Sequence, residues 1–324
     1  MKALRIVFMG TPEFAVATLG ALLMNGFNVV GVVTSPDKPA GRGRRLTKPK
    51  IKEFAEENCL PVWQPEDLNE PEFETAIRNL LPDLIIVVAF RKIPAKIWKI
   101  PAIGTFNLHA SLLPHYRGAA PVNHAIINGE TITGVTTFMI DDNIDTGSIL
   151  LREEVAIMPN ENAGELKTRL MKTGARLVIR TIEGLAAGTL KPVPQSLFLK
   201  EGEIPRTAPK IYPHDCIIDW TKDNVSVNNL VRGLAPEPGA RTFLKRKNEF
   251  LVMKIFECVP VDINGDYNPG CIFTDNKNTL TVACGRGQLK IITLQVEGRK
   301  KMSVAEFLRG FSLKDCEIAA NKPA

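Results

Sequence analysis

The chain has 324 residues, of which 44% are hydrophobic and 23% are charged, and it carries a formal net charge of +6 with a pI near 9.0. This length allows a sizeable core and predicts two domains, and the alternating apolar and charged blocks indicate a soluble globular protein. No apolar run is long enough to cross a bilayer, and the first one is too short for a signal peptide, so we expect a cytoplasmic protein without a membrane partner. The positive charge permits a polyanionic partner.

The six cysteines form no CxxC pair, so the sequence suggests neither a zinc knuckle nor a redox motif, and we expect free, mostly buried thiols. Three of the four histidines, His109, His115 and His124, lie close together in the sequence. Their spacing does not match HxxxH or HExxH, so no metal site is expected.

The chain opens with a β-α-β pattern. Residues 4–9 are a continuous apolar strand, Thr11 is expected to cap a helix that has Pro12 at its first position, and residues 28–33 form the next strand. This start predicts a parallel sheet with right-handed crossovers. The turn contains only Gly10, so the GxGxxG fingerprint is absent, which argues against NAD or FAD.

A basic segment follows the second strand. From Lys38 to Lys52 there are seven basic residues and no acidic one, and proline and glycine interrupt any regular structure, so we expect an exposed, mobile loop. Such a run is usually a solvated surface. Its Gly-Arg-Gly-Arg-Arg core can aim several guanidinium groups, and the loop leaves the sheet at the edge where Asn107 and His109 are expected. Contact with nucleic acid is therefore the favoured interpretation.

The rest of the first half continues the α/β alternation. Strands are predicted at 61–63, 83–90, 105–109, 134–139 and 148–156, and helices at 51–58, 72–81, within 117–129 and at 162–188, with 91–97 as a connection. We therefore predict a Rossmann-like domain with a mostly parallel sheet over residues 1–190.

Two polar side chains close the strand that ends at His109. Alternation places Asn107 and His109 on the same side, at the carboxyl end of the strand, where open parallel sheets bind their ligands. The turn-rich loop 141–147 could return the carboxylate of Asp145 to the imidazole. For a lone histidine, a buried structural role would be favoured, but this combination predicts a catalytic site.

Residues 191–213 contain five prolines and are predicted to be a linker. Beyond them, short strands are predicted at 216–220, 242–244, 250–259, 270–274, 279–284 and 288–295, with helices at 225–234 and 303–309. This pattern predicts an OB-like β-barrel domain over residues 214–324. Basic residues gather near Lys245 and near Lys300, and together with the first loop they favour a polyanion that spans both domains.

Several motifs resemble one family along essentially the whole chain. They are VFMGTPEF at 7–14, Arg42 in its basic loop, NLH at 107–109, SLLP at 111–114, RGAAP at 117–121 and IDTG at 144–147. The Asn/His/SLLP/Asp set resembles the 10-formyltetrahydrofolate-dependent formyltransferases and hydrolases. The basic loop, RGAAP and the C-terminal barrel make the chain similar to the methionyl-tRNA formyltransferases within that group.

The resemblance implies an enzyme that moves the formyl group of 10-formyltetrahydrofolate to the α-amino group of methionyl initiator tRNA, for translation initiation. It implies that Asn107, His109 and Asp145 are catalytic. The implied folate-binding residues are Phe90, Ser111, Leu112, Leu113, Pro114, Ile140 and Asp142. The implied tRNA-binding residues are Lys38, Arg42, Arg44, Arg45, Lys245, Arg246, Lys247, Lys300 and Lys301, with Arg42 reading the acceptor end. A monomer without a metal is expected.

The sequence departs from the family at 89–91, where Ala-Phe-Arg stands in place of Ala-Tyr-Gly. An arginine at this position could crowd the pterin or pair with the glutamate tail of the folate. The alternatives to the implied function are formyl transfer to another amine (glycinamide ribonucleotide or an amino-sugar nucleotide), hydrolysis of the donor, and tRNA binding without catalysis.

Overall fold

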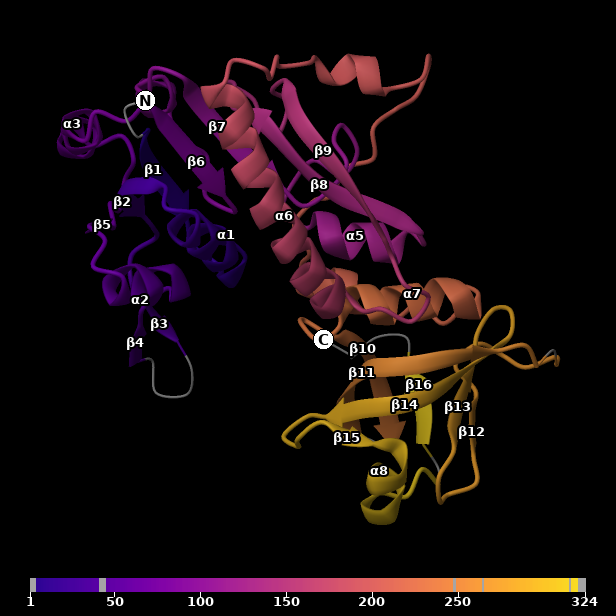
Figure 1. The fold of residues 1–324 in the computed structure, drawn as a ribbon. Helices are drawn as coiled ribbons and strands as arrows, with labels where there is room; N and C mark the ends of the chain where they lie inside the picture. Colours follow the sequence, from indigo (N-terminus) through magenta and orange to yellow (C-terminus); the bar gives the residue numbers. More distant parts are fainter. Residues whose placement is uncertain (1–3, 41–44, 247–248, 264, 315, 320–324) are drawn as a thin grey trace. The chain divides into compact units, whose positions relative to one another are not determined.

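The computed structural model describes residues 4–40, 45–246, 249–263, 265–314 and 316–319. The chain divides into two compact units (Figure 1). Unit 1 comprises the residues up to Pro121 together with Ile132–Ala156 and Lys167–Ala208, and unit 2 comprises Val122–Thr131, Ile157–Leu166 and the residues from Pro209 onward. The domain boundaries at 190 and 213 stay a prediction, and most of the proline-rich segment groups with unit 1.

Unit 1 is built on a seven-stranded sheet with the order β5-β2-β1-β6-β7-β8-β9. The first five strands in this order are parallel, as apolar runs joined by helices require, and the last two are antiparallel. The prediction of a mostly parallel sheet is confirmed. The strands are β1 (Arg5–Gly10), β2 (Asn28–Val33), β5 (Val62–Trp63), β6 (Leu84–Val88), β7 (Gly104–His109), β8 (Ile132–Met139) and β9 (Ile149–Ala156).

Helices cover both faces of this sheet. On one face, Val7, Ile85 and Val87 pack with Phe73 and Ile77 of α3 (Pro71–Asn79) and with Ile97 of α4 (Ala95–Trp98). On the other face, α6 (Ala163–Ala186) packs against β7 and β8, since Gly174 lies beside Leu108 and the Thr181 hydroxyl lies 2.8 Å from that of Thr137. Asn107 is in register with Val87, so its side chain lies on the α3 face. Helices α1 (Glu13–Met24) and α2 (Lys50–Glu57) pack together at the start of the unit.

Three local predictions are wrong. Thr11 does not cap α1, because its hydroxyl bonds instead with the Ser35 hydroxyl at 3.0 Å. The basic segment is not wholly irregular: β3 (Lys38–Ala40) and β4 (Arg45–Thr47) pair as an antiparallel hairpin. Residues 216–220 form no strand, because a short 3₁₀ helix, η2 (Pro213–Cys216), leads into a single bridge between Ile217 and Arg241.

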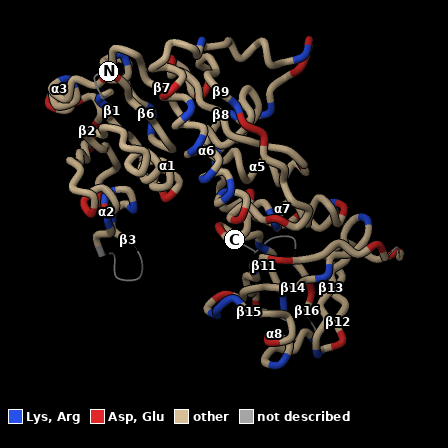
Figure 2. Tube along the Cα trace, viewed as in Figure 1, with Lys and Arg blue, Asp and Glu red and all other residues tan. Residues whose placement is uncertain are grey.

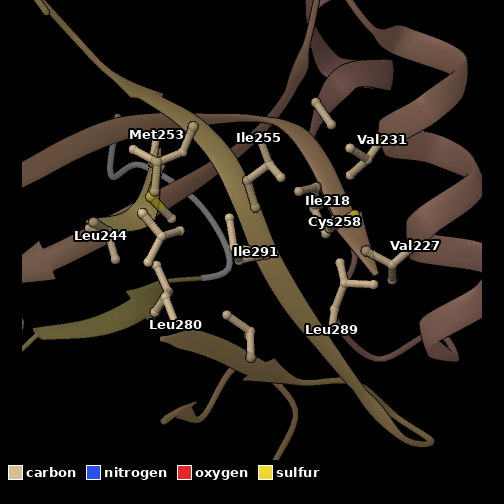
Figure 3. Close-up of a cluster of buried hydrophobic side chains, with 14 of the residues drawn as sticks. Ile218, Val227, Val231, Leu244, Met253, Ile255, Cys258, Leu280, Leu289 and Ile291 are labelled. Carbon is tan, nitrogen blue, oxygen red and sulfur yellow. The ribbon is translucent and has the colours of Figure 1, made fainter. Parts of the chain in front are cut away.

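Unit 2 holds an antiparallel, nearly closed sheet with the order β12-β13-β14-β11-β10-β16, and β15 pairs with β14. Apolar side chains on the inner face of this sheet pack with Val227 and Val231 of α7 (Asn224–Leu234), as Figure 3 shows. The predicted barrel-like architecture is confirmed. The other elements are α5 (Pro121–Ile127), β10 (Ala240–Arg246), β11 (Glu249–Val261), β12 (Ile272–Thr274), β13 (Leu280–Ala283), β14 (Gln288–Val296), β15 (Met302–Ser303), α8 (Val304–Gly310) and β16 (Cys316–Ala319).

In the part of the chain that the structure describes, no helix combines the length and the apolarity that a membrane span needs.

Candidate active site

His109 ends β7 and is held by a carbonyl group on the loop that follows. Its side chain is 7% exposed, and its Nε2 lies 2.8 Å from the backbone oxygen of Tyr116. A carbonyl oxygen only accepts hydrogen bonds, so Nε2 carries a proton and donates it to Tyr116. In the neutral ring, Nδ1 is then the basic nitrogen, and it is available for proton transfer.

The carboxylate of Asp145 faces this nitrogen. Asp145 Oδ2 lies 3.8 Å from His109 Nδ1 and accepts a hydrogen bond of 3.0 Å from the backbone N–H of Gly118. The backbone of Asp145 has φ +57°, the left-handed region that residues other than glycine seldom adopt. The loop between β8 and β9 thus brings the acid to the imidazole. The separation is longer than a hydrogen bond, so in this structure the carboxylate acts on Nδ1 through its charge.

Asn107 lies two residues before His109 on the same strand and face. Its side chain is partly buried. Within the described residues, its carboxamide has no hydrogen-bond partner, whereas His109 and Asp145 both have one. An amide with uncommitted N–H groups beside a basic imidazole nitrogen is suited to stabilise negative charge on a bound carbonyl oxygen.

The SLLP segment forms the turn next to His109 and is fixed through Thr136 of β8. The Thr136 hydroxyl accepts from the Leu113 N–H at 3.1 Å and donates to the Ser111 oxygen at 2.7 Å, and all three residues are fully buried. Leu113 packs with Phe138 and Ile149. Leu112 is half-buried and Pro114 is buried, with a cis bond before Pro114. The buried side chains of Ser111, Leu113 and Pro114 shape the turn. The backbone of the turn and the Leu112 side chain are the groups that a ligand could contact.

Three further residues predicted to bind folate lie near the ends of β6 and β8. Phe90 and Ile140 are partly buried and pack against the same apolar cluster on the α3 face, whereas Asp142 is exposed. Arg91, the residue in place of the usual glycine, donates to the carbonyl oxygens of Pro65 and Glu66, and its guanidinium lies 5.8 Å from the centroid of the Phe90 ring. Its side chain is thereby committed to the neighbouring loop.

The charges of the basic segment are partly neutralised. Lys52 pairs with Asp37 at 2.9 Å, Lys48 with Glu56 at 2.7 Å and Lys50 with Glu53 at 2.9 Å, and Figure 2 shows both charge types along α2. Lys38 of β3 is exposed and has no acidic partner among the described residues. Arg42 and Arg44 lie outside the described residues, and Arg45 is described only as backbone in β4.

The described basic residues predicted for unit 2 lie at the end of β10 and just before β15. Lys245 pairs with Glu317 at 2.6 Å, the Arg246 guanidinium lies 6.0 Å from the centroid of Phe311, and the Lys301 ammonium lies 4.9 Å from the centroid of Phe256. Lys300 is exposed, and Lys247 lies outside the described residues. Basic groups beside aromatic rings are a common feature of nucleic-acid surfaces.

Sequence reasoning missed the groups that hold the site together. These are the Tyr116 carbonyl oxygen, the Gly118 N–H, the Thr136 hydroxyl and the Gln195 side chain, which bonds to Arg117. Two are backbone groups, which no side-chain pattern reveals. Gln195 lies in the segment predicted to be a linker. The one local signal at this position is the preceding Pro194, and it does not indicate a role in the site.

Family models match both halves of the chain. A formyl transferase family model matches residues 4–182, and a model of the formyl transferase C-terminal domain matches residues 210–312. The methionyl-tRNA formyltransferase of Flavobacterium johnsoniae is 47% identical over 315 residues, which cover 97% of this chain and 98% of that protein. That of Bacteroides fragilis is 46% identical over 313 residues, covering 96% of each chain.

A solved structure shares the fold at low identity. WlaRD, a sugar 3N-formyltransferase crystallised with dTDP and 5-N-formyl-tetrahydrofolate, superposes with a TM-score of 0.63 at 20% identity and covers 93% of this chain and 100% of its own. Both family models match in order, and relatives at 46% and 47% identity span nearly the whole length. The chain therefore belongs to the formyl transferase family, in its methionyl-tRNA formyltransferase group.

Proposed function

We propose that this chain transfers the formyl group of 10-formyltetrahydrofolate to the α-amino group of methionyl initiator tRNA, and that it does so as a cytoplasmic monomer. The observation that carries the proposal is the arrangement of Asn107, His109 and Asp145 at the carboxyl end of a central strand. The names of the relatives, each matched along nearly its whole length, support formyl transfer to methionyl-tRNA. The donor 10-formyltetrahydrofolate is what the motif resemblance implies.

The residues at this edge of the sheet fit an N-formyl donor. Among the residues that the structure describes, the N–H groups of Asn107 have no hydrogen-bond partner, and one ring nitrogen of His109 makes no hydrogen bond. Phe90 and Ile140 provide partly buried apolar surface on the same face, suited to an aromatic ring system, together with the turn formed by Ser111, Leu112, Leu113 and Pro114. Bound 10-formyltetrahydrofolate supplies an electrophilic formyl carbon.

Asn107 stabilises the oxyanion that develops on the formyl oxygen when the amine nitrogen attacks the formyl carbon. Nδ1 of His109 accepts the proton that the amine loses, while Nε2 keeps its hydrogen bond to the Tyr116 oxygen. Asp145 stabilises the resulting imidazolium at 3.8 Å. As the bond from the formyl carbon to the folate nitrogen breaks, His109 returns the proton to that nitrogen, so the products are a formylated amine and tetrahydrofolate.

The acceptor is assigned to tRNA because of the basic groups on both units. Lys38, with Arg42, Arg44 and Arg45 beside it in the sequence, forms the candidate contact of unit 1, and Arg42 is proposed to read the acceptor end. Lys245, Arg246, Lys247, Lys300 and Lys301 form that of unit 2. Neutralising phosphates with these groups would supply affinity that falls steeply as salt rises.

The test is formyl transfer with 10-formyltetrahydrofolate as donor and one of four acceptors: methionyl initiator tRNA, methionyl elongator tRNA, glycinamide ribonucleotide or none. Fast transfer confined to the initiator tRNA is expected. Transfer to glycinamide ribonucleotide, or hydrolysis without an acceptor, would overturn the assignment of tRNA as the acceptor. It would leave the proposed roles of Asn107, His109 and Asp145 unchanged. The absence of turnover with every acceptor would favour a binding protein.

A further inference from the structure

A buried glutamine outside the catalytic trio makes four hydrogen bonds in unit 1. Gln195 begins the 3₁₀ helix η1 (Gln195–Phe198) and is 4% exposed. Its Nε2 donates to the backbone oxygens of Asp145 and Gly147 at 2.9 and 2.8 Å. Its Oε1 accepts from Nε and from a terminal nitrogen of Arg117, at 3.1 and 2.7 Å.

These partners leave only one orientation for the amide. Both carbonyl oxygens can only accept, and the guanidinium can only donate, so the nitrogen must face the loop of Asp145 and the oxygen must face Arg117. Both N–H groups and both lone pairs of the oxygen are then used. Such a fully satisfied buried amide fixes the position of its partners, whereas a side chain with uncommitted groups would not.

One side of this amide holds the loop that carries the acid. Asp145 has φ +57°, and a Cβ on Gly147 would stand 1.6 Å from the Met139 oxygen, so the loop passes as close to β8 as a backbone can. A conformation of this kind costs free energy and persists only where its surroundings impose it. The two bonds from Gln195 lie on either side of Thr146 and oppose relaxation of the loop.

The other side holds the loop that carries the partners of the catalytic pair. Arg117 stands between Tyr116, whose oxygen accepts from His109, and Gly118, whose N–H donates to Asp145. Gln195 therefore joins the two backbone segments that set the separation of His109 Nδ1 and Asp145 Oδ2.

We propose that Gln195 is a positioning residue, which holds Asp145 against His109 by tying loop 145–147 to the Arg117 segment. The expected loss of kcat rests on the proposed function, whereas the expected displacement of Asp145 does not. A one-ångström displacement of a catalytic group lowers turnover without a comparable effect on substrate binding.

Gln195→Met keeps the size of the side chain and removes all four hydrogen bonds. We expect kcat for formylation of methionyl initiator tRNA to fall roughly 10- to 100-fold while both KM values stay within about threefold. In an Asp145→Asn background, the same substitution should lower kcat by less than about threefold, because residues that act as a unit are not additive. An equal loss in both backgrounds would overturn the proposal.

A second variant, Gln195→Glu, separates loss of the positioning hydrogen bonds from loss of folding. The carboxylate keeps the bonds from Arg117, but it has no N–H for the oxygens of Asp145 and Gly147, so a folded variant with the kcat of Gln195→Met is expected. The matched control is Asn224→Leu in unit 2, since Asn224 is also a buried amide that donates to two backbone oxygens, those of Val261 and Gln288. Wild-type kcat in either Gln195 variant would contradict the proposal, as would an equal loss in the control.

Hydrogen exchange tests the same inference without substrate. The Gly118 N–H bonds to the Asp145 carboxylate, so its exchange rate in the free protein reports where that carboxylate lies. About tenfold faster exchange at Gly118 is expected in Gln195→Met and not in Asn224→Leu. Unchanged exchange at Gly118 in Gln195→Met would overturn the positioning role, whatever the chain formylates. A wild-type chain that formylates no tRNA would instead reject the proposed function and leave the exchange test intact.

Discussion

At the level of single residues, the site is defined by which polar atoms already have partners. His109 Nε2 is bonded to Tyr116, and Asp145 Oδ2 is bonded to Gly118. Within the described part of the chain, the atoms left without a hydrogen bond are the Asn107 amide, His109 Nδ1 and the second carboxylate oxygen of Asp145. One neutral donor, one base and one anion, brought together from β7 and from the loop between β8 and β9, are what amine attack on a formyl group requires.

The first prediction concerns Asn107. Asn107→Ala removes the proposed oxyanion donor, and one such donor is worth on the order of 3 kcal/mol of barrier, so we expect kcat to fall by about two to three orders of magnitude. The fold should be unaffected, because within the described residues the carboxamide supports no other group. Single-turnover formylation kinetics measure the loss. The control is Asn25→Ala, which removes an exposed amide bonded to Ala21 at the end of α1. Normal turnover in Asn107→Ala would remove Asn107 from the mechanism.

Part of the site could be predicted from the sequence because strand alternation is local. Alternation alone places Asn107 and His109 on one face, and the turn-forming residues near Asp145 predict a loop that can approach them. The partners of the pair could not be predicted. The positive φ values of Tyr116 and Asp145 arise from tertiary contacts, and Gln195 reaches the site from 50 residues beyond Asp145.

At the level of elements, the basic segment shows how tertiary contacts override a local pattern. Prolines and glycines predict an irregular loop, but Lys38–Ala40 pairs with Arg45–Thr47. The base of the hairpin is fixed by Asp37, which accepts from Gln64 at 2.7 Å and from Lys52 at 2.9 Å, and these bonds hold the pKa of Asp37 below its ordinary value. These partners lie up to 27 residues away, beyond the reach of local propensity.

The hairpin prediction compares two lysines of the same segment. Lys38 is exposed without an acidic partner among the described residues, whereas pairing with Glu56 partly neutralises Lys48 and raises its pKa. Lys38→Ala should raise the KM for methionyl initiator tRNA roughly two- to fivefold and lower the salt slope of binding by about 1. Lys48→Ala should change both by less. Equal effects of the two substitutions on tRNA binding, measured across a salt series, would show that pairing does not select the contacts.

At the level of the whole molecule, length and composition predict two units but not which segments belong to each unit. The proline-rich segment predicts one crossing between domains, yet unit 2 includes Val122–Thr131 and Ile157–Leu166 from the first half of the chain. In unit 2, Asn123 donates to the Gly233 oxygen at 2.7 Å, and Arg232 donates to the Glu161 oxygen at 2.9 Å. Such contacts join positions 71 to 110 residues apart, and no periodicity or turn signal encodes them.

This membership predicts that residues 209–324 are less stable alone than in the full chain. The fragment lacks the segments bonded to Gly233 and Arg232 at the end of α7, as well as Ile127, which packs against the core of unit 2. Looser packing of α7 should expose Cys258, whose thiol lies 3.3 Å from Asn228 Oδ1 on that helix. Opening of this kind is measurable as local loss of protection.

Thiol labelling at pH 8 measures this opening, because the thiolate is the reactive form. Burial raises the pKa of the Cys258 thiol and raises that of Cys284 to about 12. Both should therefore resist iodoacetamide in the full chain, while the exposed Cys271 reacts. In the fragment, Cys258 should react at least about tenfold faster, with Cys271 as the unchanged internal control. Equal protection of Cys258 in the fragment and the full chain would show that the barrel and α7 keep their packing without the two early segments, and that a cut after Ala208 separates independent domains.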